Sequence, residues 1–222
     1  MKEKEQIKKY KEYIKEYKNE KKIISKSKII IRDYLEEFKG KLKAAIKVAL
    51  EDSIDDYGNE GIYMFTLAYL YQYDNSYFWS VISTEDKYKE LIKDKESNLM
   101  YYRYSPEESP NWEAGCIAFD EMNNAFVEMV EKQEFDEERC DEDDKFWDSF
   151  EFDNFYNELE EVCLQSLNEI REEGFLEKIK LENIIFQFYV REHYPMEKDI
   201  EMFRNINKGK DKAIEEFIKS FE

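Results

Sequence analysis

The side chains best suited to catalysis are few in this chain of 222 residues. His193 is the single histidine, so a Ser-His-Asp or Cys-His mechanism would have to use it. It follows a predicted strand, where an exposed or capping role is the commoner one. Cys116, Cys140 and Cys163 lie far apart without a CxxC pair, which argues against a disulfide framework and a zinc site. We therefore expect no catalytic centre, metal or cofactor, and the sequence favours a protein that is not an enzyme.

One arginine is the best candidate for binding a small ligand. Arg103 is the only basic residue between Lys95 and Lys132, with Tyr104 beside it and Trp112 nearby. An arginine among aromatic rings can offer its planar set of donors to a carboxylate or phosphate, or stack on a ring. In so acidic a chain, an internal ion pair is the commoner outcome. Arg103, Tyr104 and Trp112 are thus the candidate ligand-binding residues.

An acidic run at residues 134–144 is the candidate surface for binding a partner. It lacks the central glycine and the final glutamate of an EF-hand loop, so calcium binding is not expected. Dense like charges normally form a solvated loop, and the functional alternative is a docking surface for a basic protein. The candidate partner-binding residues are Glu137, Glu138, Asp141, Asp143 and Asp144.

The charge distribution separates the first fifty residues from the rest. The net charge is −19, yet residues 1–50 carry 16 Lys or Arg and 8 Asp or Glu, a net +8, which leaves −27 for residues 51–222. Such an acidic body repels phosphates, which excludes nucleic acid as the expected partner, and it attracts basic proteins. The simpler interpretation is that the acid only keeps the protein soluble.

The apolar residues indicate a folded protein outside the membrane. Hydrophobic residues make up 42% of the chain and aromatic residues 16%, enough for a core despite 39% charged residues. Every apolar run is far shorter than the roughly 20 residues that span a bilayer, and the charged start lacks the apolar segment of a signal peptide. We expect a cytoplasmic protein that is a monomer or a weak homodimer.

Hydrophobic spacing predicts helices and a few strands. Residues 1–25 have a narrow apolar stripe that could pack on the body, pair with a second copy or fray, and self-association is the least favoured of these. Further helices are predicted at 27–53, at 116–133, at 144–173 and after Pro195, and another is predicted to start within 83–86. Strands are predicted at 61–73, 77–82 and 184–191, the first two as a hairpin and the first buried on both faces. Residues 55–61 should break the second helix, and residues 99–112 read as irregular.

These elements predict an α+β fold. We expect a small, mainly antiparallel sheet of about three to four strands, covered by several helices. Residues 1–30 form a basic helical extension in this interpretation, and residues 31–222 form a single domain.

Several short motifs resemble an uncharacterised bacterial family, domain of unknown function 4303. They are the acidic turn and strand start at 54–63, the turn at 74–77, the helix start at 83–85, and Tyr102-Arg103-Tyr104-Ser105-Pro106 followed by Trp112. The resemblance covers roughly Tyr34 to Glu222. Two departures stand out, since Lys208 replaces the proline expected after Asn207, and Glu192-His193-Tyr194-Pro195 matches the family's aspartates poorly.

The resemblance implies no reaction and no catalytic residues, but such families often look like parts of toxin–immunity or defence loci. The first functional hypothesis is therefore a protein-binding module, such as a toxin-neutralising immunity protein with an acidic docking surface. The alternative is an enzyme or small-ligand-binding domain whose pocket surrounds Arg103 and Trp112.

Overall fold

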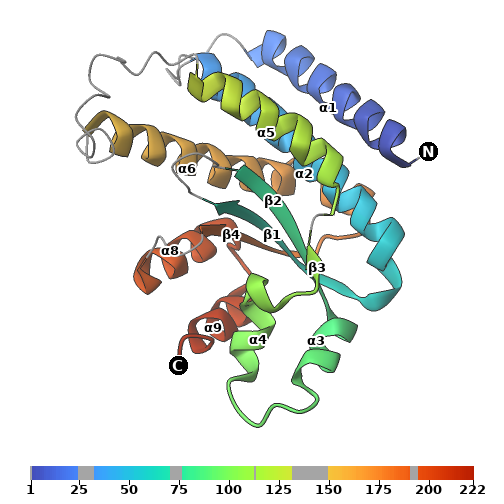
Figure 1. Ribbon diagram of the computed structural model, residues 1–222, viewed down its shortest axis with the longest axis vertical. Coiled ribbons are helices and arrows are strands. Elements are labelled where there is room, and N and C mark those ends of the chain that lie inside the picture. The colour runs from blue at the N-terminus through green and yellow to red at the C-terminus, as the bar shows by residue number, and fades with distance from the viewer. Residues whose placement is uncertain (1, 25–32, 71–76, 113, 132–149, 191–194) are drawn as a thin grey trace.

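The computed structural model describes residues 2–24, 33–70, 77–112, 114–131, 150–190 and 195–222. Within these ranges the chain forms one four-stranded sheet with helices on both of its faces (Figure 1). The strands are β1 (Ile62–Leu70), β2 (Tyr77–Thr84), β3 (Asn111–Trp112) and β4 (Ile185–Val190). The helices are α1 (Lys2–Ile24), α2 (Asp33–Tyr57), α3 (Glu85–Ile92), α4 (Leu99–Tyr104), α5 (Cys116–Glu131), α6 (Phe150–Glu172), α7 (Phe175–Lys178), α8 (Met196–Ile206) and α9 (Asp211–Lys219). This confirms the predicted α+β class.

The sheet has the strand order β3-β2-β1-β4. β1 and β2 form the predicted hairpin, with antiparallel pairing from Ile62 and Thr84 to Leu70 and Tyr77. β3 is antiparallel to β2, whereas β4 runs parallel to β1. The parallel pairing arises because the chain crosses back through helices before β4 begins, so that β4 starts at the same end as β1. The sheet is therefore mixed, with two of its three pairings antiparallel.

β1 is the central strand and is buried on both faces, as predicted. Phe65, Leu67 and Tyr69 belong to the large core under α2, α5 and α6. Met64 and Ala68 point to the opposite face, where smaller clusters form, one of them with α4, α8 and α9. Residues from both faces are almost completely excluded from solvent, which places β1 at the centre of the fold.

The predicted end of the second helix was wrong. α2 continues to Tyr57 and then tightens into the 3-10 turn η1 (Gly58–Glu60). Ser53 is fully buried on the inner face of α2, and its hydroxyl donates to the carbonyl of Leu50 at 2.8 Å. The chain leaves the helix only at Gly61, whose φ of 74° favours glycine. The acidic residues at 55 and 56 therefore lie on the exposed face of α2 and do not end the helix.

The segment 99–112, predicted to be irregular, contains ordered elements. It forms α4, the 3-10 turn η2 (Pro106–Glu108) and the edge strand β3. Each element is too short to show a periodic pattern, and the two prolines obscure what periodicity remains. This segment places Tyr104 against the sheet, where it is 4% exposed.

α1 packs on the body, the outcome that the sequence favoured together with fraying. Tyr10 is buried in the main core, and the Tyr13 hydroxyl donates to Glu51 of α2 at 2.5 Å. Gly40 permits this close approach, because a Cβ atom there would lie 2.5 Å from Cδ1 of Tyr17. The glycine that weakens α2 as an isolated helix is therefore the residue over which α1 packs.

Two asparagines bind backbone groups of the sheet that no strand pairs, one on β2 at Phe78, where β3 does not extend, and one on the edge strand β4. On β2, the Phe78 amide donates to Oδ1 of Asn123 at 2.8 Å, and the Asn123 amide donates to the Phe78 carbonyl at 2.8 Å. On β4, the Phe186 amide donates to Oδ1 of Asn207 at 3.0 Å, and Nδ2 of Asn207 donates to the Phe186 carbonyl at 2.6 Å. Each side chain replaces one residue of a missing strand, which blocks further pairing at those positions.

Candidate functional site

Arg103 makes the internal ion pair that the sequence analysis weighed against ligand binding. Its Nη1 and Nη2 atoms donate to the Glu85 carboxylate at 3.2 and 2.5 Å, and its Nε atom lies 3.9 Å from Glu216. The guanidinium carbon lies 4.2 Å from the ring centre of Tyr63 and 4.9 Å from that of Tyr88. The hydrogen bond from Arg103 lowers the pKa of Glu85. The guanidinium therefore joins α3 to α4 and has its strongest partner within the chain.

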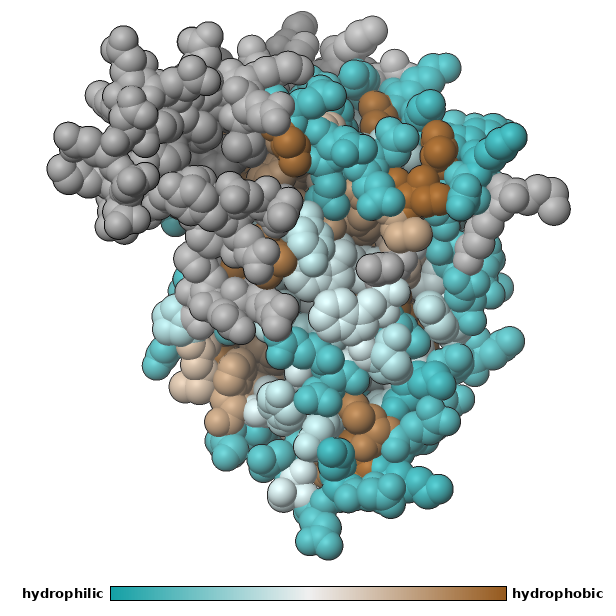
Figure 2. All heavy atoms as spheres, viewed as in Figure 1, coloured by the Kyte–Doolittle hydropathy of each residue, from teal (hydrophilic) through white to brown (hydrophobic). Residues whose placement is uncertain are grey.

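Trp112 forms an aromatic cluster with two residues of β2, the exposed Tyr77 and the buried Trp79. Its ring stacks on Trp79 with 5.7 Å between centres and 15° between planes, and Trp79 contacts Tyr77 at 5.2 Å. We call Tyr77, Trp79 and Trp112 the tryptophan strip. Trp112 is 41% exposed and Tyr77 is 42% exposed. Pale side chains of intermediate hydropathy gather over β2 and β3 at the centre of the view in Figure 2.

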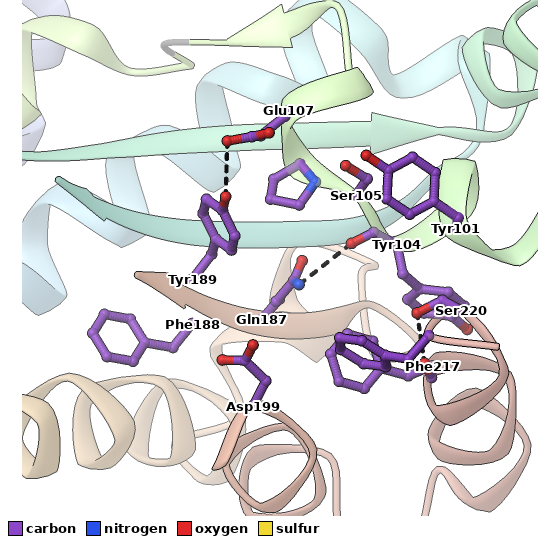
Figure 3. Close-up of a pocket in the computed structure, with 12 residues that line it drawn as sticks. Tyr101, Tyr104, Ser105, Glu107, Gln187, Phe188, Tyr189, Asp199, Phe217 and Ser220 are labelled. Atoms are coloured by element: carbon purple, nitrogen blue, oxygen red, sulfur yellow. Dashed lines mark hydrogen bonds between the residues drawn. The ribbon is translucent and has the colours of Figure 1, made fainter. Parts of the chain in front are cut away.

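A pocket of about 190 Å³ lies beside this strip, between β4 and helices α4, α8 and α9 (Figure 3). Its lining residues are Tyr101, Tyr104, Ser105, Pro106, Glu107, Gln187, Phe188, Tyr189, Asp199, Phe217, Ser220 and Phe221. Tyr104 is thus the one predicted ligand-binding residue that lines it. The alternative hypothesis required Arg103 to point into a pocket around Arg103 and Trp112, and neither residue belongs to this lining.

The polar floor of the pocket is fixed by hydrogen bonds. Gln187 is 6% exposed, and its Oε1 accepts from the Thr66 hydroxyl at 3.0 Å while its Nε2 donates to the Tyr104 carbonyl at 3.3 Å. The Tyr104 hydroxyl donates to Glu216 at 3.0 Å, and burial raises the pKa of that tyrosine. Because these side chains are held from two sides, the pocket is largely pre-formed.

Asp199 differs from the other polar groups of the pocket. It lies in the first turn of α8 and extends toward Gln187 and Phe188 of β4 (Figure 3). Its carboxylate makes no hydrogen bond or ion pair within the described ranges of the chain. Burial raises its pKa to about 6, although Lys198 acts in the opposite direction. A partly buried carboxylate without a partner destabilises its own protein, so it marks a candidate functional group.

Two features of the sequence are consistent with this pocket. Asp199 precedes Met202 by three residues and Phe203 by four, which puts an acid on the buried face of an amphipathic helix. Gln187 is the polar residue of the otherwise apolar strand Ile185–Val190. Neither signal identifies the pocket alone, because its walls come from segments about eighty residues apart in sequence.

The strip and the pocket form a continuous surface. Tyr189 packs against the cluster that contains Trp79, and it also lines the pocket. Its hydroxyl donates to Glu107 at 2.9 Å (Figure 3). Among the lining residues that the structure describes there are two carboxylates and no lysine or arginine. This surface therefore combines aromatic rings with unbalanced negative charge.

Other predicted residues lie elsewhere or outside the described residues. Cys163 is fully buried, where burial raises its thiol pKa, and Cys116 is exposed on α5. His193, Cys140 and the acidic candidates Glu137, Glu138, Asp141, Asp143 and Asp144 fall outside the described residues. Within the described ranges, no cluster of three or more potential metal ligands occurs. The helices described here include none with the length and apolarity needed to cross a membrane.

Comparison with known proteins gives one match. The model of a family described as a domain of unknown function, DUF4303, matches residues 42–208, which include β1 to β4 and the Asn207 edge contact. No curated protein and no solved structure matches the chain.

Proposed function

This chain belongs to the DUF4303 family, and we propose that it is a protein-binding module that neutralises a basic partner, such as a toxin, by covering the partner's surface. One observation carries the proposal: the exposed rings of Tyr77 and Trp112 lie in an aromatic strip near a pocket whose described lining contains carboxylates and no lysine or arginine, in a molecule of net charge −19. Partly exposed tryptophan and tyrosine are the side chains that most often anchor protein interfaces.

In this mechanism, one set of residues attracts the partner over a distance and another set makes contact with it. Carboxylates beyond residue 50 attract a basic protein over several ångströms and raise its association rate. The strip of Tyr77, Trp79 and Trp112 then supplies contact area that slows dissociation. The acidic run at 134–144 adds negative charge to the molecule and contributes to this long-range attraction. Binding alone is sufficient for this function, and no bond is made or broken.

Pairing of the basic residues supports an acidic character for the whole molecule. Lys39 and Lys43 are each 7% exposed in their side chains and pair with Glu169 of α6. Lys43 and Lys47 also pair with Glu173, at 2.5 Å in the case of Lys47. Lys39, Lys43 and Lys47 are therefore neutralised within the protein, and Lys41 pairs with Glu37 of α2, which disfavours nucleic acid as a ligand of this helix.

The test uses the proteins encoded by neighbouring genes as candidate partners. Each is purified and titrated into the full chain at about 0.05 M and about 0.5 M salt, which changes the screening length severalfold. We expect a basic neighbour to bind, with weaker affinity at high salt. Reversing Glu138, Asp141 and Asp143 to lysine should weaken binding further, chiefly by slowing association.

A matched triple variant separates local docking from total charge. Glu3, Glu5 and Glu16 are exposed on α1, and their change to lysine alters the net charge equally. If both triple variants weaken binding to the same degree, or if salt leaves the affinity unchanged, the proposal of an acidic docking surface is wrong.

The second candidate function is binding, or chemical conversion, of a small molecule in the pocket. The observation that favours it is the volume of about 190 Å³ beside Asp199, whose carboxylate has no partner among the described residues. Thermal melting with a panel of small amines and carboxylates tests it. A melting shift produced by a small amine in wild type, and lost in Asp199→Asn, would support this candidate.

A further inference from the structure

The strongest unexplained feature of the molecule is the Asp199 carboxylate. It faces a pocket whose other carboxylate, Glu107, accepts from the Tyr189 hydroxyl. Lys198, next to it in sequence, pairs instead with Glu160 at 2.6 Å. This negative group is held in a concave site, and the described lining residues include no lysine or arginine. A cation supplied by a ligand would complete the site.

The remaining lining suits a flat cation better than a compact one. Tyr101 and Phe221 line the pocket and are 42% and 41% exposed, so their rings can contact a planar group, while the buried rings of Tyr104 and Phe217 complete its apolar wall. Ser105 adds a polar side chain to its lining. A guanidinium has five N–H donors in one plane, whereas an ammonium is a point charge that gives up its hydration with more difficulty.

We propose that this pocket, between β4 and helices α4, α8 and α9, binds the guanidinium group of an arginine side chain presented by the partner protein. The proposal rests on the proposed function and names the group that the module recognises. In the complex, Asp199 accepts two N–H bonds from the guanidinium, and the aromatic walls stack on its faces. The strip of Tyr77, Trp79 and Trp112 contacts the partner beside that arginine.

Other ligand classes fit the pocket less well. Phosphates and carboxylates would meet Asp199 and Glu107 with no lysine or arginine among the described lining residues. A metal ion would find one free carboxylate, and no group of three potential ligands exists in the described part of the chain. An extended basic segment avoids both problems and matches the charge of the whole molecule.

The test is a calorimetric titration of the full chain with N-acetyl-arginine amide. The neutral isostere N-acetyl-citrulline amide and N-acetyl-lysine amide are titrated in parallel. We expect saturable binding of the arginine probe, weaker binding of the lysine probe and none of the citrulline probe. Asp199→Asn should weaken the arginine probe about tenfold to a hundredfold, since it removes a charge-assisted pair.

Two further variants test whether a loss of binding is specific to the pocket. Glu201→Gln makes the same charge change at an exposed position of α8 and should alter binding less than about twofold. Tyr101 is 42% exposed, so Tyr101→Ala should leave the fold intact while it weakens the arginine probe severalfold. Circular dichroism and melting curves verify that each variant is folded.

Three outcomes would overturn the pocket assignment. They are equal binding of the arginine and citrulline probes, tighter binding of the lysine probe, and equal effects of Asp199→Asn and Glu201→Gln. Absence of probe binding would also refute it. None of these results decides whether a basic protein binds, because the salt-dependent titration with neighbouring proteins tests that function separately.

Discussion

At the scale of single residues, Asp199 links stability to the proposed binding site. Burial is the main cause of its raised pKa, about 6, and Lys198 opposes the shift. A carboxyl whose folded pKa exceeds its unfolded value, roughly 3.9, binds a proton more readily in the folded state. The destabilisation from its charge is therefore present above pH 6 and disappears as the pH falls below 4.

The raised pKa of Asp199 in the folded state predicts how Asp199→Asn changes stability with pH. The variant should be more stable than wild type at pH 8, and the difference should shrink steadily toward pH 4. Urea unfolding of both proteins across that range measures the difference in unfolding free energy. Glu201→Gln is the control and should show no such trend. A stability difference that grows as the pH falls would refute the account of Asp199.

Asn207 and Asn123 make the same contact, on β4 and on β2, but differ in burial. Asn207 is completely buried, whereas Asn123 is half-buried. Asn207→Ala leaves the amide and carbonyl of Phe186 without partners or water, so we expect a loss of about 3 kcal/mol in unfolding free energy. Asn123→Ala should cost about 1 kcal/mol, because solvent can replace part of the contact.

Denaturant unfolding of the two variants checks this order. Asn124→Ala, an exposed position on the same helix as Asn123, is the control and should lie within about 0.5 kcal/mol of wild type. If Asn207→Ala lowers the unfolding free energy no more than Asn124→Ala does, Asn207 does not stabilise the sheet edge as proposed.

At the scale of elements, Gly40 determines how α1 sits on α2. Alanine is favoured over glycine within a helix by about 1 kcal/mol, so Gly40→Ala should strengthen α2 in isolation. Its Cβ atom would meet the Tyr17 ring at 2.5 Å and displace α1. We expect faster hydrogen exchange of α1 amides in the variant, with little change in β1.

A second substitution isolates the cause. In a Tyr17→Ala background the clash is absent, so adding Gly40→Ala should restore the helix gain and raise the melting temperature. A higher melting temperature for Gly40→Ala alone, with α1 still protected, would contradict the packing argument.

Local patterns predicted most of the elements, and long-range contacts account for the rest. The hairpin of β1 and β2 follows from alternating apolar residues, and the start of α3 follows from Thr84, whose side chain accepts from the Lys87 amide at 3.3 Å. α4 and β3 are held in place by contacts with the rest of the fold and show no periodic pattern in the sequence. The prediction that residues 99–112 are irregular was therefore wrong. The sequence indicates that Arg103 can form an internal ion pair, but it does not identify Glu85 as the partner. The pocket around Asp199 depends on β4, α4, α8 and α9 meeting in space, which no local pattern encodes.

At the scale of the whole molecule, charge and aromatic exposure act together. The net charge of −19 alone accounts for solubility and selects no partner. Exposed rings alone would invite nonspecific contacts. Their combination on one continuous surface, from Tyr77 through Tyr189 to Asp199, favours partners that are basic and can bury aromatic side chains.

The central claim is that this aromatic, acidic surface binds basic protein segments, and tryptophan fluorescence tests it most directly. A hexa-arginine peptide is titrated into the full chain at low and high salt, with hexa-glutamate as the opposite-charge control. We predict a saturable change in emission with hexa-arginine that weakens as salt rises and largely disappears in Trp112→Phe. An equal response to hexa-glutamate, or an undiminished response in Trp112→Phe, would contradict the account.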